Sequence, residues 1–503
     1  MRPRPSPPAL HTFVGIIAGL FLALSANAHG APDEPVWPEF RGPHRSGVAS
    51  PDRPDAFPVS FGPRTNLAWS VPTPAGHASP VVSGDTLFLA AFESNRLQVV
   101  ALNRADGRER WRQSLEPGRI ESGTRLSHPA SATPATDGER LIAYFAPFGL
   151  IAFDLAGREL WRHPMPTPVT QHGASSSPTL AGNLVLQLCD QDVASYLIAL
   201  DKLTGKVAWK TDRDAFRRGF STALPYPPDR PEIAVVAGTL RLVAYDLATG
   251  RERWSVRGLP NEMVSSPIAV PMPAPESVSD AGSERILVAG WTYGSGVARM
   301  PTWESVLTPG DANGDGRLSR DEAPNGPAKQ HFTYIDADKD GVLTRDEYET
   351  IARIFNESKN AVMTLRPGGQ GDVTDTHVDW KQTRGLPYCP TPLAYRGRIY
   401  LVRNGGLFSC LDAATGAYRF QEERLGALGD YYASPVAGGG KILVISQAGV
   451  AVVLRAADTL DVLARNELGE QVLATPALVD GTLYVRTASR LHAFREGALP
   501  RQP

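Results

Sequence analysis

Internal repetition is the feature of this sequence that most limits the possible folds. A small residue followed by proline recurs along the chain, and a short β-prone run follows it, as at residues 86–89 and 482–485. Such a unit cannot bury both of its faces alone, so the copies must pack against one another. The openings fall near residues 78, 132, 176, 221, 265, 390, 433 and 474, and the fourth is degenerate.

A second motif follows the openings and indicates how one unit turns back on itself. Its clearest copy consists of Ala199, Asp201, Gly205 and Trp209. The Asp side chain can cap the turn, and the glycine supplies the positive φ that closes a hairpin. The tryptophan offers a large area to bury against the neighbouring unit. We therefore expect each unit to be one four-stranded blade.

Radial stacking of these units predicts an all-β fold, the eight-bladed β-propeller, with seven blades as the alternative. The last unit ends after Phe494 without a tryptophan strand, whereas residues 67–69 form a tryptophan strand with no unit before it. The two fragments complement each other. We expect this N-terminal strand to complete the last blade and close the ring.

The N-terminus has the pattern of a secretory signal. Arg2 and Arg4 are positively charged, residues 13–24 are apolar, and residues 26–28 match a small-x-small cleavage site. The apolar run is shorter than the roughly 20 residues of a spanning helix. We predict a cleaved signal peptide at residues 1–28 without lipid attachment, and a periplasmic or secreted mature chain with no membrane span.

The composition gives no reason to expect nucleic acid as a partner. The chain has 51 Lys and Arg residues against 53 Asp and Glu residues, and its 42% of hydrophobic residues suffice for a sizeable core. An exported compartment allows Cys389 and Cys410 to form a disulfide. The alternative is that these two and Cys189 are all small buried residues.

An insertion in the fifth unit contains the clearest sequence motifs for metal binding. Pro267 and Pro392 are about 125 residues apart where a blade needs about 45, and the excess includes two loops of EF-hand form. Calcium prefers about six to eight oxygen ligands, which positions 1, 3, 5, 7, 9 and 12 of such a loop supply around a glycine at position 6. We predict two Ca²⁺ sites. Their ligands are Asp311, Asn313, Asp315, Arg317, Ser319 and Glu322 in the first loop, and Asp336, Asp338, Asp340, Val342, Thr344 and Glu347 in the second.

The residues around these loops predict a compact α-helical pair. Leu318 and Leu343 are at position 8 of their loops, where paired EF-hand loops form a short β-bridge. Helices are expected at about residues 301–308 and 347–357. Pro324 and Pro327 shorten the helix after the first loop, so the first site is expected to be the weaker.

The Ala-x-Asp, Thr-Gly-Lys/Arg and Trp pattern resembles the pyrroloquinoline-quinone (PQQ) repeat. The resemblance to PQQ-like β-propeller proteins covers about residues 37–496, and residues 37–43 with Ser46 and Gly47 are similar to a lead-in of members from environmental bacteria. The chain is more distantly similar to the propeller subunit of the outer-membrane β-barrel assembly machine. That subunit is usually a lipoprotein, and no lipidation cysteine follows the cleavage site here.

The loops that enter the blades of a propeller converge on its axis. Polar or aromatic residues stand just before several openings and are candidates for binding a cofactor, ligand or metal in a central funnel. The alternative is that they bond to backbone at the top of the ring. The candidates are His77, His128, His172, Tyr388, Tyr431 and Tyr432.

The sequence contains no Gly-x-Ser-x-Gly, His-Glu-x-x-His or Walker motif, so no catalytic residue is assigned. The resemblance implies that a quinone dehydrogenase has two adjacent cysteines against the cofactor, and none are adjacent here. We interpret the chain as a non-catalytic binding or scaffold module of the envelope, monomeric, with a protein or polysaccharide partner. A PQQ-dependent oxidoreductase with the cofactor in the funnel is the alternative.

These patterns together predict the organisation of the chain. The expected segments are a signal peptide at 1–28, a lead-in at 29–65, a first propeller part at 66–300, an EF-hand pair at 301–360, a second propeller part at 361–496 and a tail at 497–503.

Overall fold

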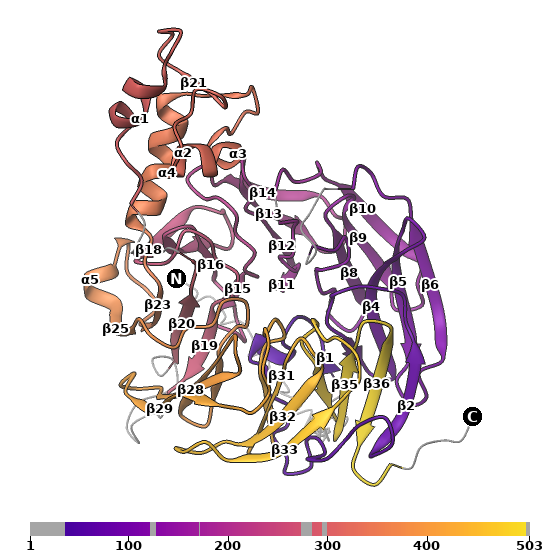
Figure 1. Ribbon diagram of the computed structural model, residues 1–503. Helices are drawn as coiled ribbons and strands as arrows, with labels where there is room; N and C mark the ends of the chain where they lie inside the picture. The colour runs from indigo at the N-terminus through magenta and orange to yellow at the C-terminus, as the bar shows by residue number, and fades with distance from the viewer. Residues whose placement is uncertain (1–35, 121–126, 171, 273–283, 294–298, 499–503) are drawn as a thin grey trace, which may run out of the picture. The chain divides into compact units, whose positions relative to one another are not determined.

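Eight antiparallel sheets surround a common axis in the computed structural model (Figure 1), which describes residues 36–120, 127–170, 172–272, 284–293 and 299–498. The all-β, eight-bladed prediction is confirmed. The predicted signal peptide lies outside the described residues. Within those residues, no helix is both long and apolar enough to cross a membrane.

Blades one to four follow one another along the chain, and each is a meander whose first strand lies nearest the axis. They are β3 (Val81–Ser83), β4 (Thr86–Glu93), β5 (Arg96–Asn103) and β6 (Glu109–Leu115); β7 (Ala135–Thr136), β8 (Arg140–Phe145), β9 (Gly149–Asp154) and β10 (Glu159–Pro164); β11 (Thr179–Ala181), β12 (Leu184–Cys189), β13 (Tyr196–Asp201) and β14 (Val207–Asp212); and β15 (Leu224–Tyr226), β16 (Ile233–Gly238), β17 (Arg241–Asp246) and β18 (Glu252–Arg257).

Blades five to seven repeat this order, and the fifth contains the insertion. They are β19 (Ile268–Pro271), β20 (Glu284–Gly290), β23 (Ala361–Leu365) and β25 (Val378–Gln382); β26 (Leu393–Tyr395), β27 (Arg398–Arg403), β28 (Leu407–Asp412) and β29 (Tyr418–Arg424); and β30 (Val436–Gly438), β31 (Lys441–Ile445), β32 (Val450–Arg455) and β33 (Val462–Glu467).

The eighth blade joins the two ends of the propeller. The strands β34 (Ala477–Val479), β35 (Thr482–Arg486) and β36 (Arg490–Arg495) are completed by β2 (Leu67–Pro72), which pairs antiparallel with β36. The predicted closure by an N-terminal strand is therefore confirmed. Short elements add to the blades: β1 (Val36–Trp37) extends blade one beside β3, β24 (Gly371–Asp372) pairs with β18, and η1 (Pro43–Arg45) and α5 (Thr374–His377) lie in connections.

The tryptophan of one blade packs on the turn glycine of the next. The indole Nε1 of Trp209 in blade three donates to the carbonyl of Leu247 in blade four at 2.9 Å. A Cβ on Gly250 would lie 2.5 Å from the same indole. The glycine is thus needed for its positive φ and also for the space that the tryptophan occupies. The same contact joins Trp69 to Gly107, Trp111 to Gly157, Trp161 to Gly205 and Trp380 to Gly416.

The EF-hand pair is inserted between β20 and β23. It consists of α1 (Trp303–Gly310), β21 (Leu318–Ser319), α2 (Pro327–Gln330), α3 (Phe332–Ile335), β22 (Val342–Leu343) and α4 (Arg345–Glu357). Leu318 and Leu343 face each other in the predicted bridge between β21 and β22. The short α2 begins at Pro327, as the prolines after the first loop predict. The pair has a buried core of its own, around Trp303, Tyr348 and Ile351.

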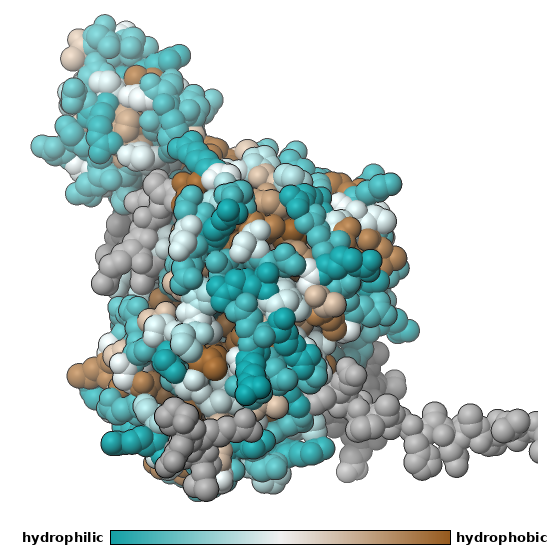
Figure 2. All heavy atoms as spheres, turned by 90° about the vertical axis from the view of Figure 1, so that its right-hand side faces the viewer, coloured by the Kyte–Doolittle hydropathy of each residue, from teal (hydrophilic) through white to brown (hydrophobic). Residues whose placement is uncertain are grey.

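The outer strands of the ring present a mainly hydrophilic surface (Figure 2). Most side chains of β6 and β10 on this face are exposed or half-buried. Brown apolar residues lie scattered among the teal ones in this view. The burial that stabilises the ring is therefore between the blades.

Replacing Gly250 by alanine should destabilise the ring, because this residue has a φ of 71° and its Cβ would overlap the Trp209 indole. We expect the free energy of unfolding to fall by about 2–4 kcal/mol. In the control Gly182→Ala, φ is 58° and a Cβ meets nothing within 4 Å, so the loss should be about 1 kcal/mol. Urea unfolding followed by circular dichroism measures both, and equal losses would contradict the role given to the tryptophan contact.

Candidate functional site

A ring of buried hydroxyls surrounds the axis. Each hydroxyl belongs to the Ser-Pro or Thr-Pro step at the start of a blade, or to the matching residue of the degenerate fourth opening. Seven hydrogen bonds of 2.8–3.2 Å connect the blades in order from one to eight, each from the backbone N–H of one such residue to the hydroxyl oxygen of the next. The residues are Ser79, Thr133, Ser177, Thr222, Ser266, Thr391, Ser434 and Thr475.

These hydroxyls line a funnel with a cavity of about 250 Å³. Phe40 of the lead-in segment also lines this cavity. The adjacent Arg41 is fully buried and donates to the carbonyls of Thr391, Pro392 and Pro435 at 3.1, 2.9 and 3.4 Å. Burial lowers the pKa of this guanidinium to about 9. The lead-in segment is therefore anchored at this axial cavity, the cup.

Five of the six residues predicted around the axis line this cup: His77, His128, His172, Tyr388 and Tyr432. The imidazole rings of His77 and His128 are 4.8 Å apart, centre to centre. The sixth candidate, Tyr431, is fully buried in the core between blades six and seven, where its hydroxyl donates to the carbonyl of Ala427.

The cup also contains residues that the sequence did not single out. Phe220 stands before the degenerate fourth opening, and its ring is 6.3 Å from that of His172. Glu262 is the one carboxylate among the described residues that line the cup. Its position three residues before Ser265 is the only signal that could have identified it. Cys389 also lines the cup.

Burial favours the uncharged forms of four side chains in the wall: His128, His172, Tyr388 and Cys389. Burial, followed by the charges of His77 and Arg486, lowers the pKa of His128 to about 3. Burial likewise lowers the pKa of His172, although Glu262 acts in the opposite direction. Burial raises the pKa of Cys389 to about 12 and raises that of the Tyr388 phenol above its usual range. The wall therefore offers neutral donors and acceptors at neutral pH.

All three cysteines are free thiols. Cys189 and Cys410 are buried, whereas Cys389 is half-buried at the cup. The structure thus favours the alternative of separate residues over a disulfide between Cys389 and Cys410.

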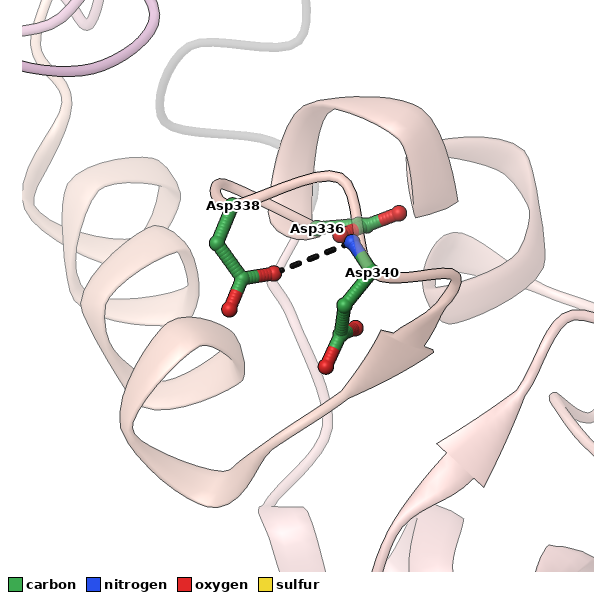
Figure 3. A group of neighbouring side chains, drawn as sticks. All are labelled: Asp336, Asp338 and Asp340. Carbon is green, nitrogen blue, oxygen red and sulfur yellow. Dashed lines mark hydrogen bonds between the residues drawn. The ribbon is translucent and has the colours of Figure 1, made fainter.

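The second EF-hand loop brings three carboxylates together (Figure 3). One oxygen each of Asp336, Asp338 and Asp340 lies within 4.8 Å of the others. The loop is shaped by backbone donors: the Asp340 N–H bonds to Asp338, and the Val342 N–H bonds to Asp340. Alternate side chains at positions 1, 3 and 5 therefore converge on one point, as calcium requires.

The side chains of the second loop are arranged to bind a cation. The Oδ1 atom of Asp336 is buried without a hydrogen-bond partner, and burial raises the pKa of this carboxyl. Glu347 accepts from the N–H groups of Ala337 and Thr344 at 2.8 and 2.9 Å, which holds its carboxylate beside the loop. A bound Ca²⁺ would satisfy Asp336 and neutralise the three aspartates.

The first loop has the same fold with different ligands. Asp311 accepts from the N–H groups of Gly314, Asp315 and Gly316, and Glu322 accepts from that of Ser319. Its third position is Asn313, whose amide oxygen is neutral. With one carboxylate fewer at positions 1, 3 and 5, this loop attracts a cation less strongly.

An eight-bladed ring of these repeats, with an EF-hand pair in blade five, defines a class: a PQQ-repeat β-propeller with a calcium-binding motif. The family model described as outer membrane protein assembly factor BamB matches residues 59–219 and 193–271, and an EF-hand model matches residues 330–352. The chain is distantly similar to BamB. No curated protein matches its sequence.

Solved structures share this fold at low sequence identity. BamB from Moraxella catarrhalis is 12% identical with a TM-score of 0.50, over 87% of this chain and 99% of that one. Quinohemoprotein alcohol dehydrogenase from Comamonas testosteroni is 13% identical with a TM-score of 0.55, over 93% and 82%. A europium-containing methanol dehydrogenase is 12% identical with a TM-score of 0.52, over 92% and 98%. An assembly factor and dehydrogenases thus share this architecture, and the similarity shows only the fold of this chain.

Replacing Glu347 by glutamine should weaken calcium binding at the second loop at least tenfold, because it removes the charged position-12 ligand. Isothermal titration calorimetry measures this affinity. The matched control is Glu357→Gln, an exposed glutamate at the end of the same helix, which should bind as the parent does. An unchanged affinity in Glu347→Gln would show that calcium binds elsewhere.

Proposed function

We propose that the protein is an exported, calcium-binding propeller module of the cell envelope, periplasmic or secreted, which binds a polysaccharide in its funnel without changing it chemically. The observation that supports this function is that burial keeps His128 and Cys389 of the cup wall neutral. An imidazole with a pKa of about 3 is a poor general base at neutral pH, and a thiol with a pKa of about 12 is a poor nucleophile.

The wall has the chemistry to hold a neutral, hydroxyl-rich ligand. Neutral imidazoles and the hydroxyls of serine, threonine and tyrosine can each donate and accept, as sugar hydroxyls do. Tyr388, Tyr432 and Phe220 add aromatic surface against which an apolar ring face can pack. The volume of about 250 Å³ is just below the roughly 300–1,000 Å³ of pockets for drug-sized ligands, so it suits one sugar unit or a chain end.

Calcium has a structural role in this proposal. Extracellular calcium modules bind at roughly 10⁻⁴–10⁻³ M, so an exported EF-hand pair is constitutively occupied. Both loops bind Ca²⁺, the second more tightly because of its three aspartates. The ions rigidify the inserted pair on the ring.

A PQQ-dependent oxidoreductase is the second candidate, supported by the fold that the chain shares with quinohemoprotein dehydrogenases. This quinone is a polycarboxylate and needs cationic partners. Among the described residues that line the cup there is neither lysine nor arginine, and no two cysteines are adjacent. The funnel therefore fits a neutral ligand better.

Soluble fragments of the host's envelope polysaccharides should bind the mature protein in calorimetry. Tyr432→Ala should weaken this binding about tenfold or more, which corresponds to about 1.4 kcal/mol. The control Tyr418→Ala changes a tyrosine on the outer strand β29, outside the cup, and should leave the affinity unchanged.

Two results would contradict the proposal. One is stoichiometric binding of PQQ together with alcohol-dependent reduction of a dye, which would establish the second candidate. The other is specific capture of an envelope protein while no saccharide fragment binds, which would assign the ring to a protein partner.

A further inference from the structure

The EF-hand pair meets the ring beside the mouth of the funnel. The ring face of Tyr334, in α3, lies over the guanidinium of Arg218 at 3.7 Å from carbon to ring centre. Tyr334 is buried, and its hydroxyl has no hydrogen-bond partner. It stands two residues before Asp336, the first ligand of the second calcium loop. The calcium loop and this contact are therefore parts of one short segment.

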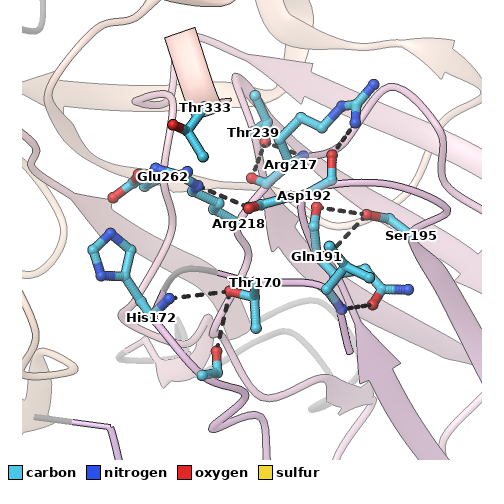
Figure 4. A network of polar contacts seen from close by, with 12 residues as sticks. Thr170, His172, Gln191, Asp192, Ser195, Arg217, Arg218, Thr239, Glu262 and Thr333 are labelled. Carbon is cyan, nitrogen blue, oxygen red and sulfur yellow. Dashed lines mark hydrogen bonds and ion pairs between the residues drawn. The ribbon is translucent and has the colours of Figure 1, made fainter. Parts of the chain in front are cut away.

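Arg218 connects that segment to two loops of the propeller (Figure 4). Its side chain is buried, and its backbone has a φ of 50°, which is unusual for arginine. The guanidinium pairs with Asp192 at 2.8 Å and with Glu262 at 3.5 Å. Asp192 lies between β12 and β13, and Glu262 precedes β19. The guanidinium of Arg218 thus contacts blade three, the segment before blade five and the EF-hand pair.

One of these partners belongs to the funnel. Glu262 lines the cup together with His172, and both lie beside Arg218 in Figure 4. The charges of Glu262, Arg218 and Asp192 all act on the pKa of His172. The environment of this imidazole therefore depends on where Arg218 and Glu262 lie.

Calcium binding at the second loop can change the contact between Tyr334 and Arg218. Its three aspartates lie within 4.8 Å of one another and repel when no cation is bound. Bound calcium removes that repulsion and fixes the loop, and with it Tyr334. A cation over an aromatic face is stabilised more strongly when the pair is desolvated, as this one is.

We propose that Arg218 is a positioning residue that couples calcium at the second loop to the funnel by holding Glu262 at the mouth of the cup. This inference rests on the proposed function, in which the cup is the ligand site. Because coupling between two sites is reciprocal, a ligand that contacts Glu262 also strengthens calcium binding. Calcium thus prepares the cup for its ligand.

The probe for this coupling is calcium alone, titrated into the mature protein with isotope-labelled histidine. Calorimetry on the same sample gives the binding curve. We expect the imidazole resonance of His172 to shift along that curve, whereas that of His77, which precedes the first strand of blade one, stays unchanged. Tyr334→Phe retains the ring face and should keep the shift. Tyr334→Leu should lose the shift while calcium still binds.

Two results would overturn the coupling: a His172 resonance that does not move while calcium binds, or one that moves equally in Tyr334→Leu. These results are distinguishable from a failure of the proposed function. A calcium-linked shift without any saccharide binding retains the coupling and rejects the polysaccharide. Saccharide affinity that is the same with calcium and with a chelator retains the polysaccharide and rejects the coupling.

Discussion

The hydrogen bond from a backbone N–H just before the first strand of one blade to the hydroxyl of the next blade is the interaction on which the rest of the structure depends. It joins neighbouring blades at the axis, where a proline, which has no N–H to satisfy, follows the hydroxyl residue at every opening except the fourth. The outer contact, in which a tryptophan fills the space over a glycine, joins the same blades at the rim. Because contacts hold neighbouring blades together both at the axis and at the rim, the blades have little freedom to tilt. The loops at the axis therefore form a rigid wall.

The N-terminal segment contributes both to the closure of the ring and to the lining of the funnel. After β1, which pairs with β3, and Arg41, which bonds to Pro392, the chain forms β2 and completes the eighth blade. Arg486 of that blade donates to the carbonyls of Ala78, Ala90 and Pro74, which ties the seam to blade one. The closure of the ring and the lining of the cup therefore depend on the same N-terminal segment. Burial lowers the pKa of His128 and raises that of Cys389, so both side chains are neutral at neutral pH.

The features that could be predicted from the sequence are those set by local motifs: the blades, the closure of the ring, the calcium loops and most of the axial residues. The turn glycines and strand tryptophans define the blades, and the orphan strand at residues 67–69 implies the closure. The EF-hand spacing predicts the convergence of Asp336, Asp338 and Asp340, because all three belong to one short loop. Five axial residues could be named because the same position before each opening points to the same axis.

The parts that escaped prediction depend on contacts distant in sequence. Arg41 bonds to carbonyls about 350 residues away, and no local pattern distinguishes it from other arginines. Arg218 and Glu262 are in irregular loops, and their meeting with Tyr334 depends on how the insertion docks on the ring. Tyr431 was grouped with the axial residues because it, like Tyr432, stands just before an opening, but its side chain is buried in the core.

The most direct test of the account is native mass spectrometry of the protein purified from its own cell envelope in the presence of calcium. The account predicts the mass of the mature chain with bound calcium and without a quinone, and with any retained ligand being a neutral saccharide. One equivalent of bound PQQ would contradict it, because the funnel would then be the site of a redox cofactor.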